Sequence, residues 1–338
     1  MPLTIFSNDI STEKQSLSLT ETDMPTCGDD DLVVKVHAIG LNPVDYKAAR
    51  GGLLGTSGIS FGWDCSGTVT QAGSNVKDFS VGDAVLFSGD VKRGGCAAEY
   101  VAVDARLVAK KPTELSFTEA ASFPLVSVTA YEAIAEQMAV TEKSAPSSTL
   151  LVINGGGGVG SAAVQLAKHH FGIGTVIATA GRAVTKEWCQ RNGADHVLDH
   201  HQPLGPQLEA LKVQPNLVLC TVDLDGYYDQ IVEFISPSGK IVSITLGDSS
   251  KIDVGKLFFP KRLTLAIELM FTKPYFGENI ASQGEMLRTI ASLFATKKLQ
   301  SIVTVTKSGL TVDNLNEGLD ALQAGKMHGK FVVNVIEE

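Results

Sequence analysis

The sequence predicts a two-domain α/β protein, with a compact β barrel or sandwich followed by a doubly wound parallel sheet. The chain has 338 residues, and a single domain commonly takes about 100–200 residues. Hydrophobic residues make up 44% of the chain and charged residues 19%, so each domain can bury a core of its own. Near residue 120 the apolar pattern also changes, from closely spaced strands to strands separated by helices.

Short strands are expected before that point. In residues 31–40, Leu32, Val34, Val36 and Ala38 would share one face of a strand, because side chains alternate between faces. Similar segments, separated by glycines and other turn residues, run over residues 67–70, 83–87 and 97–103. Short strands joined by close turns are typical of a β barrel or sandwich.

Strands and helices alternate after residue 120. The expected strands are 149–153, 175–179, 196–198, 216–221, 240–245 and 263–267. Helices are expected between them over residues 161–170, 183–192, 207–212 and 227–235. Parallel neighbours require crossover helices, so this order predicts a parallel, doubly wound sheet. The last expected strand, 330–336, rejoins the first domain, which gives domains of 1–121 with 298–338, and 122–297.

Charge and cysteine content narrow the class of protein. The 28 Lys and Arg against 37 Asp and Glu give a net charge of −9, which argues against nucleic acid or an anionic membrane as a partner. The first residues, MPLTIFSNDISTEK, lack the basic start and apolar run of a signal peptide. Five scattered cysteines without a CxxC pair indicate reduced thiols and a cytoplasmic protein.

A glycine-rich turn follows the strand expected at 149–153. The run Gly155-Gly156-Gly157-Gly158-Val159-Gly160 contains the GxGxxG spacing. In such a turn the first glycine permits a tight bend, the second a close approach of the backbone to a pyrophosphate, and the third close helix packing. The N–H groups at the start of the next helix would face the diphosphate. The turn therefore predicts dinucleotide binding, with a purely structural glycine turn as the alternative.

The end of the next strand indicates which dinucleotide binds. An NAD site commonly has an acidic residue there for the ribose 2′-hydroxyl. This chain instead continues Thr179-Ala180-Gly181-Arg182 and has no carboxylate before Glu187. The Arg182 guanidinium and the Lys186 ammonium, one helical turn later, suit a 2′-phosphate. We therefore predict NADPH rather than NADH; two solvated cations at a helix start are the alternative.

Several further motifs resemble one known family. They are Asn42-Pro43-Val44-Asp45, Gly62-Trp63-Asp64-Cys65-Ser66-Gly67-Thr68-Val69, Gly82-Asp83-Ala84-Val85, Glu268-Leu269-Met270-Phe271-Thr272 and Gly329-Lys330. With the glycine turn, they resemble the medium-chain dehydrogenase/reductase superfamily, and within it the quinone oxidoreductase branch, which includes zinc-type alcohol dehydrogenase-like proteins. The resemblance implies a GroES-like β-barrel catalytic domain, a Rossmann domain for NADPH and an active site between the two. It also implies a homodimer paired through residues 263–270.

The metal ligands of zinc-dependent relatives have no counterpart in this chain. Where those relatives place a Cys and a His-Glu pair, it has Asn42 and Trp63-Asp64, and the apolar run 124–126 covers the third position. Only Cys96 lies in residues 90–110, where a structural zinc lobe needs four cysteines. No metal site is therefore expected. Without a Lewis acid, hydride transfer to a quinone or an α,β-unsaturated carbonyl needs less activation than alcohol oxidation.

Candidate catalytic residues follow from the same resemblance. Asn42 would face the nicotinamide and the substrate, unless it only starts a turn before Pro43. The proton donor stays open between Tyr46, solvent, and Lys47, which stands where many relatives have a tyrosine. Asp64 would line the substrate pocket or serve the fold.

Further cofactor contacts are implied along the chain. Thr129 matches a position close to the nicotinamide, His200 matches a tyrosine position at the adenosine end, and Leu246 follows the strand expected at 240–245. Lys330 resembles a basic residue near the cofactor, with an ordinary strand-start lysine as the alternative. Aromatic residues would either wall an apolar pocket or belong to the core and a dimer contact: Phe258, Phe259, Phe271, Tyr275 and Phe276.

The sequence thus predicts an NADPH-dependent, zinc-independent oxidoreductase that transfers hydride to a quinone or an α,β-unsaturated carbonyl. The alternative is a non-catalytic NADPH-binding protein of the same fold with a structural or regulatory role. The glycine turn fits both, so a measurement of turnover is needed to separate them.

Overall fold

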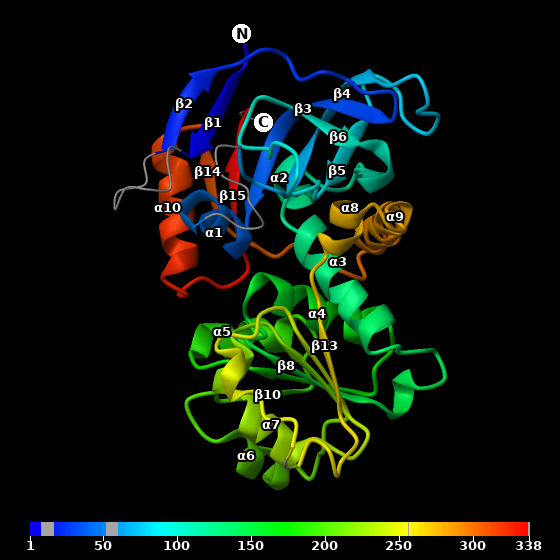
Figure 1. Ribbon diagram of the computed structural model, residues 1–338, viewed down its shortest axis with the longest axis vertical. Coiled ribbons are helices and arrows are strands. Elements are labelled where there is room, and N and C mark those ends of the chain that lie inside the picture. The colour runs from blue at the N-terminus through cyan, green and yellow to red at the C-terminus, as the bar shows by residue number, and fades with distance from the viewer. Residues whose placement is uncertain (8–16, 52–59, 256, 337–338) are drawn as a thin grey trace. The chain divides into compact units, whose positions relative to one another are not determined.

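The structure, a computed structural model, describes residues 1–7, 17–51, 60–255 and 257–336. It contains two compact units, drawn in Figure 1. Unit 1 comprises residues 1–128, 271–297 and 301–338, and unit 2 comprises residues 129–270 and 298–300. The expected domains differ from these units in three segments, since residues 122–128 and 271–297 belong to unit 1 and residues 298–300 to unit 2.

Unit 1 is built on a mainly antiparallel sheet of seven strands. The strand order is β14-β15-β3-β4-β5-β7, and β6 also pairs with β3. The strands are β3 (Asp31–Leu41), β4 (Cys65–Ala72), β5 (Ala84–Phe87), β6 (Tyr100–Asp104), β7 (Val108–Lys110), β14 (Val303–Ser308) and β15 (Lys330–Asn334). A separate antiparallel pair consists of β1 (Leu3–Ser7) and β2 (Leu17–Glu21).

The long strand β3 is buried on both faces at two of its positions. Val33 and Ile39 are as fully buried as Leu32 and Val34, although the alternating pattern predicted one buried face, whereas Lys35 between them is exposed. Strands β15, β4 and β6 pair with the edges of β3, and helix α2 (Phe117–Ala120) packs against it.

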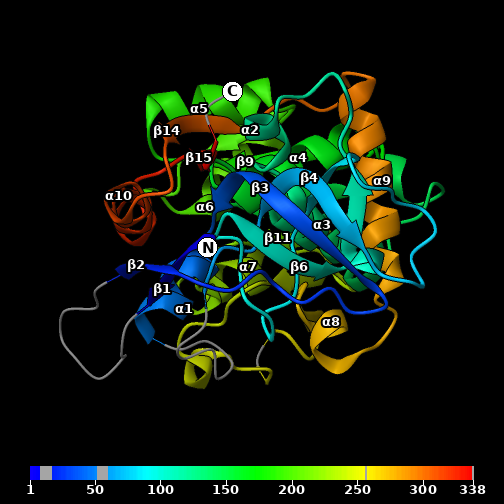
Figure 2. The same ribbon diagram turned by 90° about the horizontal axis from the view of Figure 1, so that it is seen from above.

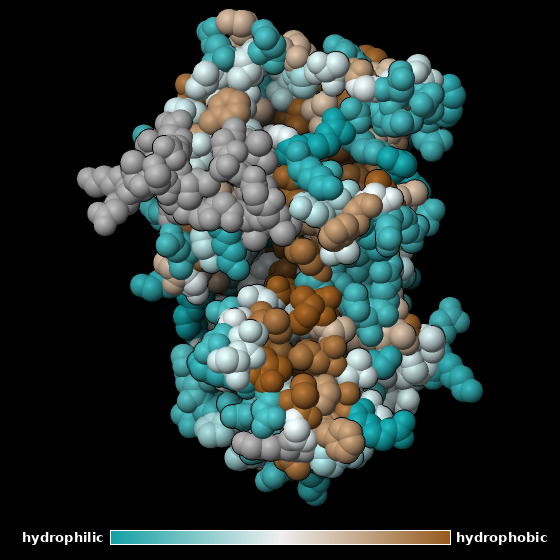
Figure 3. All heavy atoms as spheres, viewed as in Figure 1, coloured by the Kyte–Doolittle hydropathy of each residue, from teal (hydrophilic) through white to brown (hydrophobic). Residues whose placement is uncertain are grey.

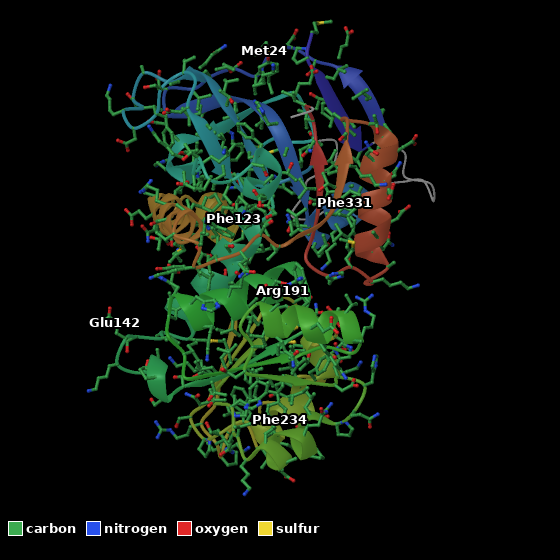
Figure 4. All side chains as sticks on the ribbon, turned by 180° about the vertical axis from the view of Figure 1, so that it is seen from behind. Met24, Phe123, Glu142, Arg191, Phe234 and Phe331 are labelled. Carbon is green, nitrogen blue, oxygen red and sulfur yellow. The ribbon has the colours of Figure 1, made fainter. Side chains whose placement is uncertain are left out.

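Helices pack at both ends of the unit 1 sheet. α9 (Ala281–Ala295) contacts β7, and α10 (Val312–Gln323) contacts β15; Figure 2 shows the two helices on opposite sides. Phe123, labelled in Figure 4, stacks on Phe294 of α9 at a ring-centroid distance of 4.1 Å, so apolar packing holds α9 in unit 1. The unit also contains α1 (Pro43–Gly51), α8 (Thr272–Phe276) and the start of α3 (Pro124–Glu132).

Unit 2 is a parallel sheet of six strands in the order β10-β9-β8-β11-β12-β13. The strands are β8 (Thr149–Ile153), β9 (Thr175–Thr179), β10 (His196–Leu198), β11 (Leu217–Cys220), β12 (Lys240–Ser243) and β13 (Thr264–Ile267). The intervening helices include α4 (Gly158–His169), α5 (Ala183–Arg191), α6 (Leu204–Leu211) and α7 (Tyr228–Phe234). The predicted parallel, doubly wound sheet is confirmed, and each expected strand lies within two residues of its observed bounds.

The central strands of unit 2 are apolar throughout. Leu151, Ile177, Val218 and Ile241 are all fully buried in one core cluster, as expected for strands covered by helices on both faces. None of the helices in the described part of the chain combines the length and the apolar character needed to span a bilayer.

Candidate functional site

The glycine turn lies at the end of β8, where the strand order of unit 2 reverses. The chain runs from β8 to β9 and β10 on one side, and from β11 to β12 and β13 on the other. Open α/β sheets bind ligands at such a switch point. The N–H of Asn154, directly after β8, donates to Thr179 Oγ1 at 2.9 Å. The N–H of Gly155 donates to the Thr179 carbonyl oxygen at 3.1 Å, so the turn is fastened to the end of β9.

Two glycines of the turn permit close packing. A Cβ atom on Gly155 would lie 2.6 Å from Ala178 Cβ of β9, and one on Gly160 would overlap the Asn154 carbonyl oxygen. The tight bend expected at Gly155 occurs instead at Asn154, which has a left-handed backbone with φ 63°. Gly155 lets the turn pack against β9, whereas the contact of Gly160 agrees with its expected role in helix packing.

The start of α4 supplies hydrogen-bond donors for an anion. Gly157 is the N-cap residue, with φ −74° and ψ 174°, and α4 begins at Gly158. The N–H groups in the first turn of a helix have no carbonyl partner within the helix, and here they belong to Gly158, Val159 and Gly160. Because most of these residues lack side chains, a diphosphate could approach the backbone closely. The residues of this turn therefore fit a dinucleotide.

The end of β9 has a buried part and an exposed part. Thr179 and Ala180 are buried; the Thr179 hydroxyl accepts from Asn154, and the Ala180 N–H donates to the Leu198 carbonyl oxygen at 2.9 Å. The Thr179 hydroxyl and the Ala180 N–H are therefore engaged in hydrogen bonds within unit 2. Arg182, the N-cap residue of α5, is exposed, so its guanidinium is accessible to a 2′-phosphate.

Lys186 is paired with a carboxylate that the sequence reasoning missed. Lys186 Nζ lies 2.9 Å from Asp199 Oδ2. Hydrogen bonds from the His201 N–H and from Lys186 hold the pKa of Asp199 below its ordinary value. The position of Asp199 in the sequence could have indicated this contact, because Asp199 directly follows β10, and the end of β10 lies beside the end of β9. A 2′-phosphate would have to share Lys186 with Asp199.

The other predicted cofactor residues of unit 2 are spread over three elements. His200 is half-buried beside Gly181, near Arg182 and Lys186. Leu246, which follows β12, packs against the apolar core cluster, and Thr129 is buried in α3. Of these residues, only His200 therefore joins the group at the ends of β9 and β10.

Three of the predicted residues meet inside unit 1. Lys330 Nζ donates to Asp64 Oδ2 and to Asn42 Oδ1, at 2.6 Å in each case, and Asn42 Nδ2 donates to Asp64 Oδ2 at 2.8 Å. All three residues are at most 2% exposed. They converge because Asn42 follows β3, Asp64 precedes β4 and Lys330 begins β15, and these strands are antiparallel neighbours. Lys330 is thus part of a buried network, and its predicted place near the cofactor stays a prediction.

Burial and hydrogen bonding act in opposite directions on Asp64. Burial raises the pKa of the Asp64 carboxyl, whereas the Lys330 ammonium and the hydrogen bonds from Lys330, Asn42 and Leu125 favour the charged form. The Leu125 N–H donates to Asp64 Oδ1 at 2.6 Å. Since both carboxylate oxygens accept hydrogen bonds and an ammonium adjoins one of them, the geometry supports an ion pair.

Asp45 is a second buried carboxyl next to this network, and the sequence reasoning gave it no role. Its Oδ2 accepts from the Asn42 N–H at 2.6 Å and its Oδ1 from the Gly62 N–H at 3.1 Å. Burial, partly opposed by these hydrogen bonds, raises the pKa of Asp45 to about 7. Asp45 thereby fixes the backbone of the two segments that carry Asn42 and Asp64. The contact of Asp45 with the Asn42 N–H could have been expected from the sequence, because Asp45 is an acidic residue in the first turn of the helix that follows Asn42.

Tyr46 and Lys47 lie outside the network. Both belong to α1, in which Asp45, Ala48 and Ala49 are buried. Successive helical side chains point about 100° apart, so Lys47 is exposed and Tyr46 is only half-buried. Neither side chain takes part in the hydrogen bonds of the Asn42 network, and a role for Tyr46 or Lys47 as proton donor stays a prediction.

The aromatic residues expected to wall one pocket are divided between the units. Phe258 packs on the core cluster of unit 2, whereas the neighbouring Phe259 is 79% exposed. In unit 1, Phe271 is buried with its ring edge toward Trp63, at a centroid distance of 5.9 Å. Tyr275 and Phe276 contact each other. Core and surface packing account for these contacts.

Two family profiles match the chain. The profile described as an alcohol dehydrogenase GroES-like domain matches residues 28–113, and the profile described as zinc-binding dehydrogenase matches residues 158–291. A zinc-type alcohol dehydrogenase-like protein of Staphylococcus aureus (strain COL) is 36% identical over 315 residues, which cover 92% of this chain and 92% of that protein. The chain belongs to the medium-chain dehydrogenase/reductase superfamily.

Other members of the superfamily extend the comparison. A Rhizobium etli CFN 42 protein assigned as a zinc-dependent alcohol dehydrogenase is 35% identical, with a TM-score of 0.92 over 100% of this chain and 99% of that chain. A Coxiella burnetii quinone oxidoreductase is 27% identical, with a TM-score of 0.80 over 99% of each chain. An NADPH-dependent alkenal/one oxidoreductase of Arabidopsis thaliana is 31% identical over 319 residues, 92% of this chain and 73% of that protein. The predicted GroES-like and Rossmann fold is confirmed, and the superfamily relatives support oxidoreductase activity.

The residues in the Asn42 network do not fit the zinc ion that some superfamily members bind. The Lys330 ammonium already lies 2.6 Å from both Asn42 Oδ1 and Asp64 Oδ2, and a zinc ion would have to displace it. Asn42 and Asp64 would then offer an amide and a carboxylate without the thiolate or imidazole that zinc prefers. In the described part of the chain, no three His, Cys, Asp or Glu side chains are arranged to hold a metal ion.

Proposed function

We propose that this chain is an NADPH-dependent, zinc-independent reductase of quinones or α,β-unsaturated carbonyls. The substrate class is supported by the quinone oxidoreductase and the alkenal/one oxidoreductase among its relatives. NADPH is supported by the exposed Arg182 at the end of β9 and by the NADPH dependence in the name of the Arabidopsis relative.

The observation that carries the proposal is the buried Lys330 ammonium between Asp64 and Asn42. By the resemblance described above, it is a fixed cation near the place where zinc-dependent relatives hold their metal. An acceptor that needs little Lewis-acid activation then fits best. In a quinone or an α,β-unsaturated carbonyl, conjugation itself stabilises the anion that forms after hydride transfer, so the protein mainly has to orient the reactants.

Asn42 is the residue of the network that would contact the substrate or the nicotinamide amide. Its Oδ1 accepts from Lys330, which polarises the amide and strengthens the Nδ2–H groups as donors. One of these N–H groups serves Asp64 at 2.8 Å. The Nδ2 atom also donates to the Gly40 carbonyl oxygen, at the longer distance of 3.4 Å, and a developing oxyanion would take the place of this weaker acceptor. Asp45 would keep the Asn42 backbone in place during this step. NADPH, when bound, supplies the hydride.

The residues proposed to hold NADPH lie in unit 2. The N–H groups of residues 158–160 would bind the diphosphate, and Arg182 would bind the 2′-phosphate. Lys186 would assist Arg182 while it remains paired with Asp199. Thr129, His200 and Leu246 remain proposed contacts of the nicotinamide and adenosine parts.

We also propose a homodimer paired through β13. This strand is at the edge of the unit 2 sheet, and its last residue, Ile267, is exposed. Figure 3 shows apolar surface on the face of unit 2 that carries β13 in Figure 1; the exposed residues include Val254, Leu257, Phe259, Ile267 and Leu269. An open strand edge beside apolar side chains favours pairing with a second copy.

The test of the proposed activity is oxidation of NADPH by purified, chelator-treated protein. An ortho-quinone and an α,β-unsaturated ketone are offered as separate acceptors. We expect turnover of at least one acceptor at a rate that the chelator does not change. Turnover that the chelator abolishes and added zinc restores would overturn zinc independence. Tight NADPH binding without turnover of either acceptor would favour the non-catalytic NADPH-binding alternative.

A further inference from the structure

Two adjacent imidazoles face the turn between β9 and α5. The rings of His200 and His201 lie at a centroid distance of 4.7 Å and are inclined by 80°. A Cβ atom on Gly181 would collide with the Nε2 atoms of both rings. The two Nε2 atoms therefore converge on the backbone of Gly181, one residue before Arg182.

The charges around this histidine pair come from the ends of β9 and β10 and from α5. Arg182 and Lys186 are positive, and Asp199 is negative; all three influence His200, as does the His201 ring. Asp199 is already engaged, since it accepts from the His201 N–H at 3.0 Å and from Lys186 Nζ at 2.9 Å. The group thus places two imidazoles and two permanent cations beside one carboxylate.

The protonation of His200 depends on the charge of any ligand that binds beside its ring. Burial, followed by the influence of His201, Lys186 and Arg182, lowers the pKa of His200, and Asp199 opposes this only in part. Without a ligand the His200 ring is therefore neutral near neutral pH. A phosphate monoester carries about −1.5 to −2 charges at pH 7. Placed among these side chains, it would favour the imidazolium form, since an adjacent opposite charge stabilises the charged state.

We infer that His200, held beside His201 at the turn between β9 and α5, recognises the 2′-phosphate of NADP(H) by taking up a proton when it binds. The proton comes from solvent and adds to an imidazole ring nitrogen, with no change in oxidation state. NAD(H), which has a 2′-hydroxyl in that place, binds without this uptake. The inference rests on the proposed cofactor and adds a pH dependence to the choice between the two dinucleotides.

The proton linkage is measured by calorimetric titration of the full-length protein. NADP⁺ and NAD⁺ are each titrated at pH 7 in non-phosphate buffers that differ in ionisation enthalpy. We expect the slope of the binding enthalpy against the ionisation enthalpy to show proton uptake with NADP⁺ and none with NAD⁺. The bound phosphate cannot produce this signal, because cations that stabilise its dianion make it release protons.

Variants assign the uptake to His200. His200→Gln should abolish the uptake, and the double variant His200→Gln with His201→Gln should show none either. The matched control is His169→Gln, which removes a histidine whose pKa is also lowered by burial but which lies at the far end of α4. This variant should keep the full uptake. NMR titration of the histidine ring protons, with and without NADP⁺, gives a second measurement on the unaltered protein and should show the pKa of His200 rising with NADP⁺.

The possible outcomes separate a failure of the proton uptake from a failure of the proposed cofactor. NADP⁺ binding without proton uptake, or uptake that survives in His200→Gln, would overturn the inference and leave the proposed cofactor intact. Equal dissociation constants for NADP⁺ and NAD⁺, or no binding of either, would overturn the proposed cofactor and the inference with it.

Discussion

At the scale of single residues, the ion pair of Lys330 and Asp64 is far more buried than the exposed pair of Lys307 and Glu317. Its side chains are 2% and 0% exposed, whereas those of the Lys307–Glu317 pair in unit 1 are 35% and 54% exposed. A buried charge that loses its partner stays in a medium of low polarity, where water cannot replace the partner. An exposed charge is resolvated, and its pair contributes little.

This difference predicts the effect of removing each lysine. Lys330→Met should lower the free energy of unfolding of unit 1 by about 3–5 kcal/mol, and the matched Lys307→Met by about 0–1 kcal/mol. Denaturant unfolding is followed by the fluorescence of Trp63 in a Trp188→Phe background, because Trp63 is in unit 1 and Trp188 in unit 2. Equal losses in the two variants would contradict the ion pair. The loss in Lys330→Met should shrink at low pH, where Asp64 can take up a proton.

A second buried group is the carboxyl pair of Glu132 and Glu268 in unit 2. Each residue is 3% exposed, and Glu268 Oε1 lacks a hydrogen-bond partner within the described residues. Burial, reinforced by the neighbouring Glu132, raises the pKa of Glu268 to about 9. Glu268 therefore carries a proton at neutral pH in the folded chain.

The stability of unit 2 should consequently fall as the pH rises. Between the ordinary pKa of 4.5 and the folded value of about 9, the folded chain binds more protons at Glu268 than the unfolded chain. The contribution of Glu268 thus decreases through this window, by up to about 1.4 kcal/mol per pH unit. Glu268→Gln should remove this slope, so the stability of the variant relative to wild type should increase with pH.

The measurement is denaturant unfolding at several pH values in a Trp63→Phe background, in which Trp188 reports on unit 2. The control is Glu209→Gln, which changes an exposed carboxylate on α6 and should leave the slope unchanged. Parallel pH profiles for wild type and Glu268→Gln would show that Glu268 does not carry the proton.

At the scale of elements, the turn from β9 into α5 sets the choice of cofactor. Arg182→Ala should weaken NADPH binding by about 10–100-fold, because a charge-assisted hydrogen bond contributes about 1.5–3 kcal/mol. NADH binding should change by less than about twofold, since it makes no contact with a phosphate there. Dissociation constants from nicotinamide fluorescence check both values.

The matched control for that variant is Lys143→Ala. Lys143 is an exposed cation of unit 2, close in sequence to Met138, whose carbonyl oxygen accepts from Lys240 at the start of β12. Lys143 therefore lies near the N-terminal ends of the strands, whereas the glycine turn lies at their C-terminal ends. Its variant should leave both dissociation constants unchanged. The same ratio of NADPH to NADH affinity in Arg182→Ala and wild type would refute the role of Arg182.

Local sequence patterns were enough to predict the strands of unit 2, but they did not predict where some helices of unit 1 pack. Each strand of the parallel sheet is a short apolar run next to turn residues, so its identity does not depend on distant contacts. The placement of α9 does depend on them, because its apolar side packs against β7 and Phe123, far away in the sequence. Residues 271–297 therefore group with unit 1 in the structure, whereas the local patterns placed them with the parallel sheet.

In the candidate site, short motifs likewise identified single residues but not the contacts between them. Asn42, Asp64 and Lys330 were each named from short motifs, but Lys330 and Asp64 are separated by 266 positions, and no local pattern records their contact. Asp199 and Asp45 were missed, because their roles depend on the register of β10 beside β9 and on the approach of Gly62 to α1.

At the scale of the whole molecule, the edge strand β13 determines the proposed assembly. Ile267→Lys places a charge on the open edge, and we expect it to convert a dimer into a monomer. Val81→Lys is the matched control, because Val81 is a similarly exposed apolar residue, 68% exposed, in unit 1, and its variant should stay dimeric. Sedimentation velocity measures both. A monomeric wild type, or an Ile267→Lys variant that sediments like wild type, would contradict the dimer.

The position of β15 in the unit 1 sheet has a consequence for the order of folding during synthesis. β3 lies between β4, which follows it early in the chain, and β15, which is the last of the described strands in chain order. Until the ribosome has released residue 330, Asp64 and Asn42 lack their ammonium partner and β3 has an open flank. Most of unit 2, residues 129–270, has emerged by then. The later-encoded unit can therefore fold first, in contrast to the usual order from the N-terminus onward.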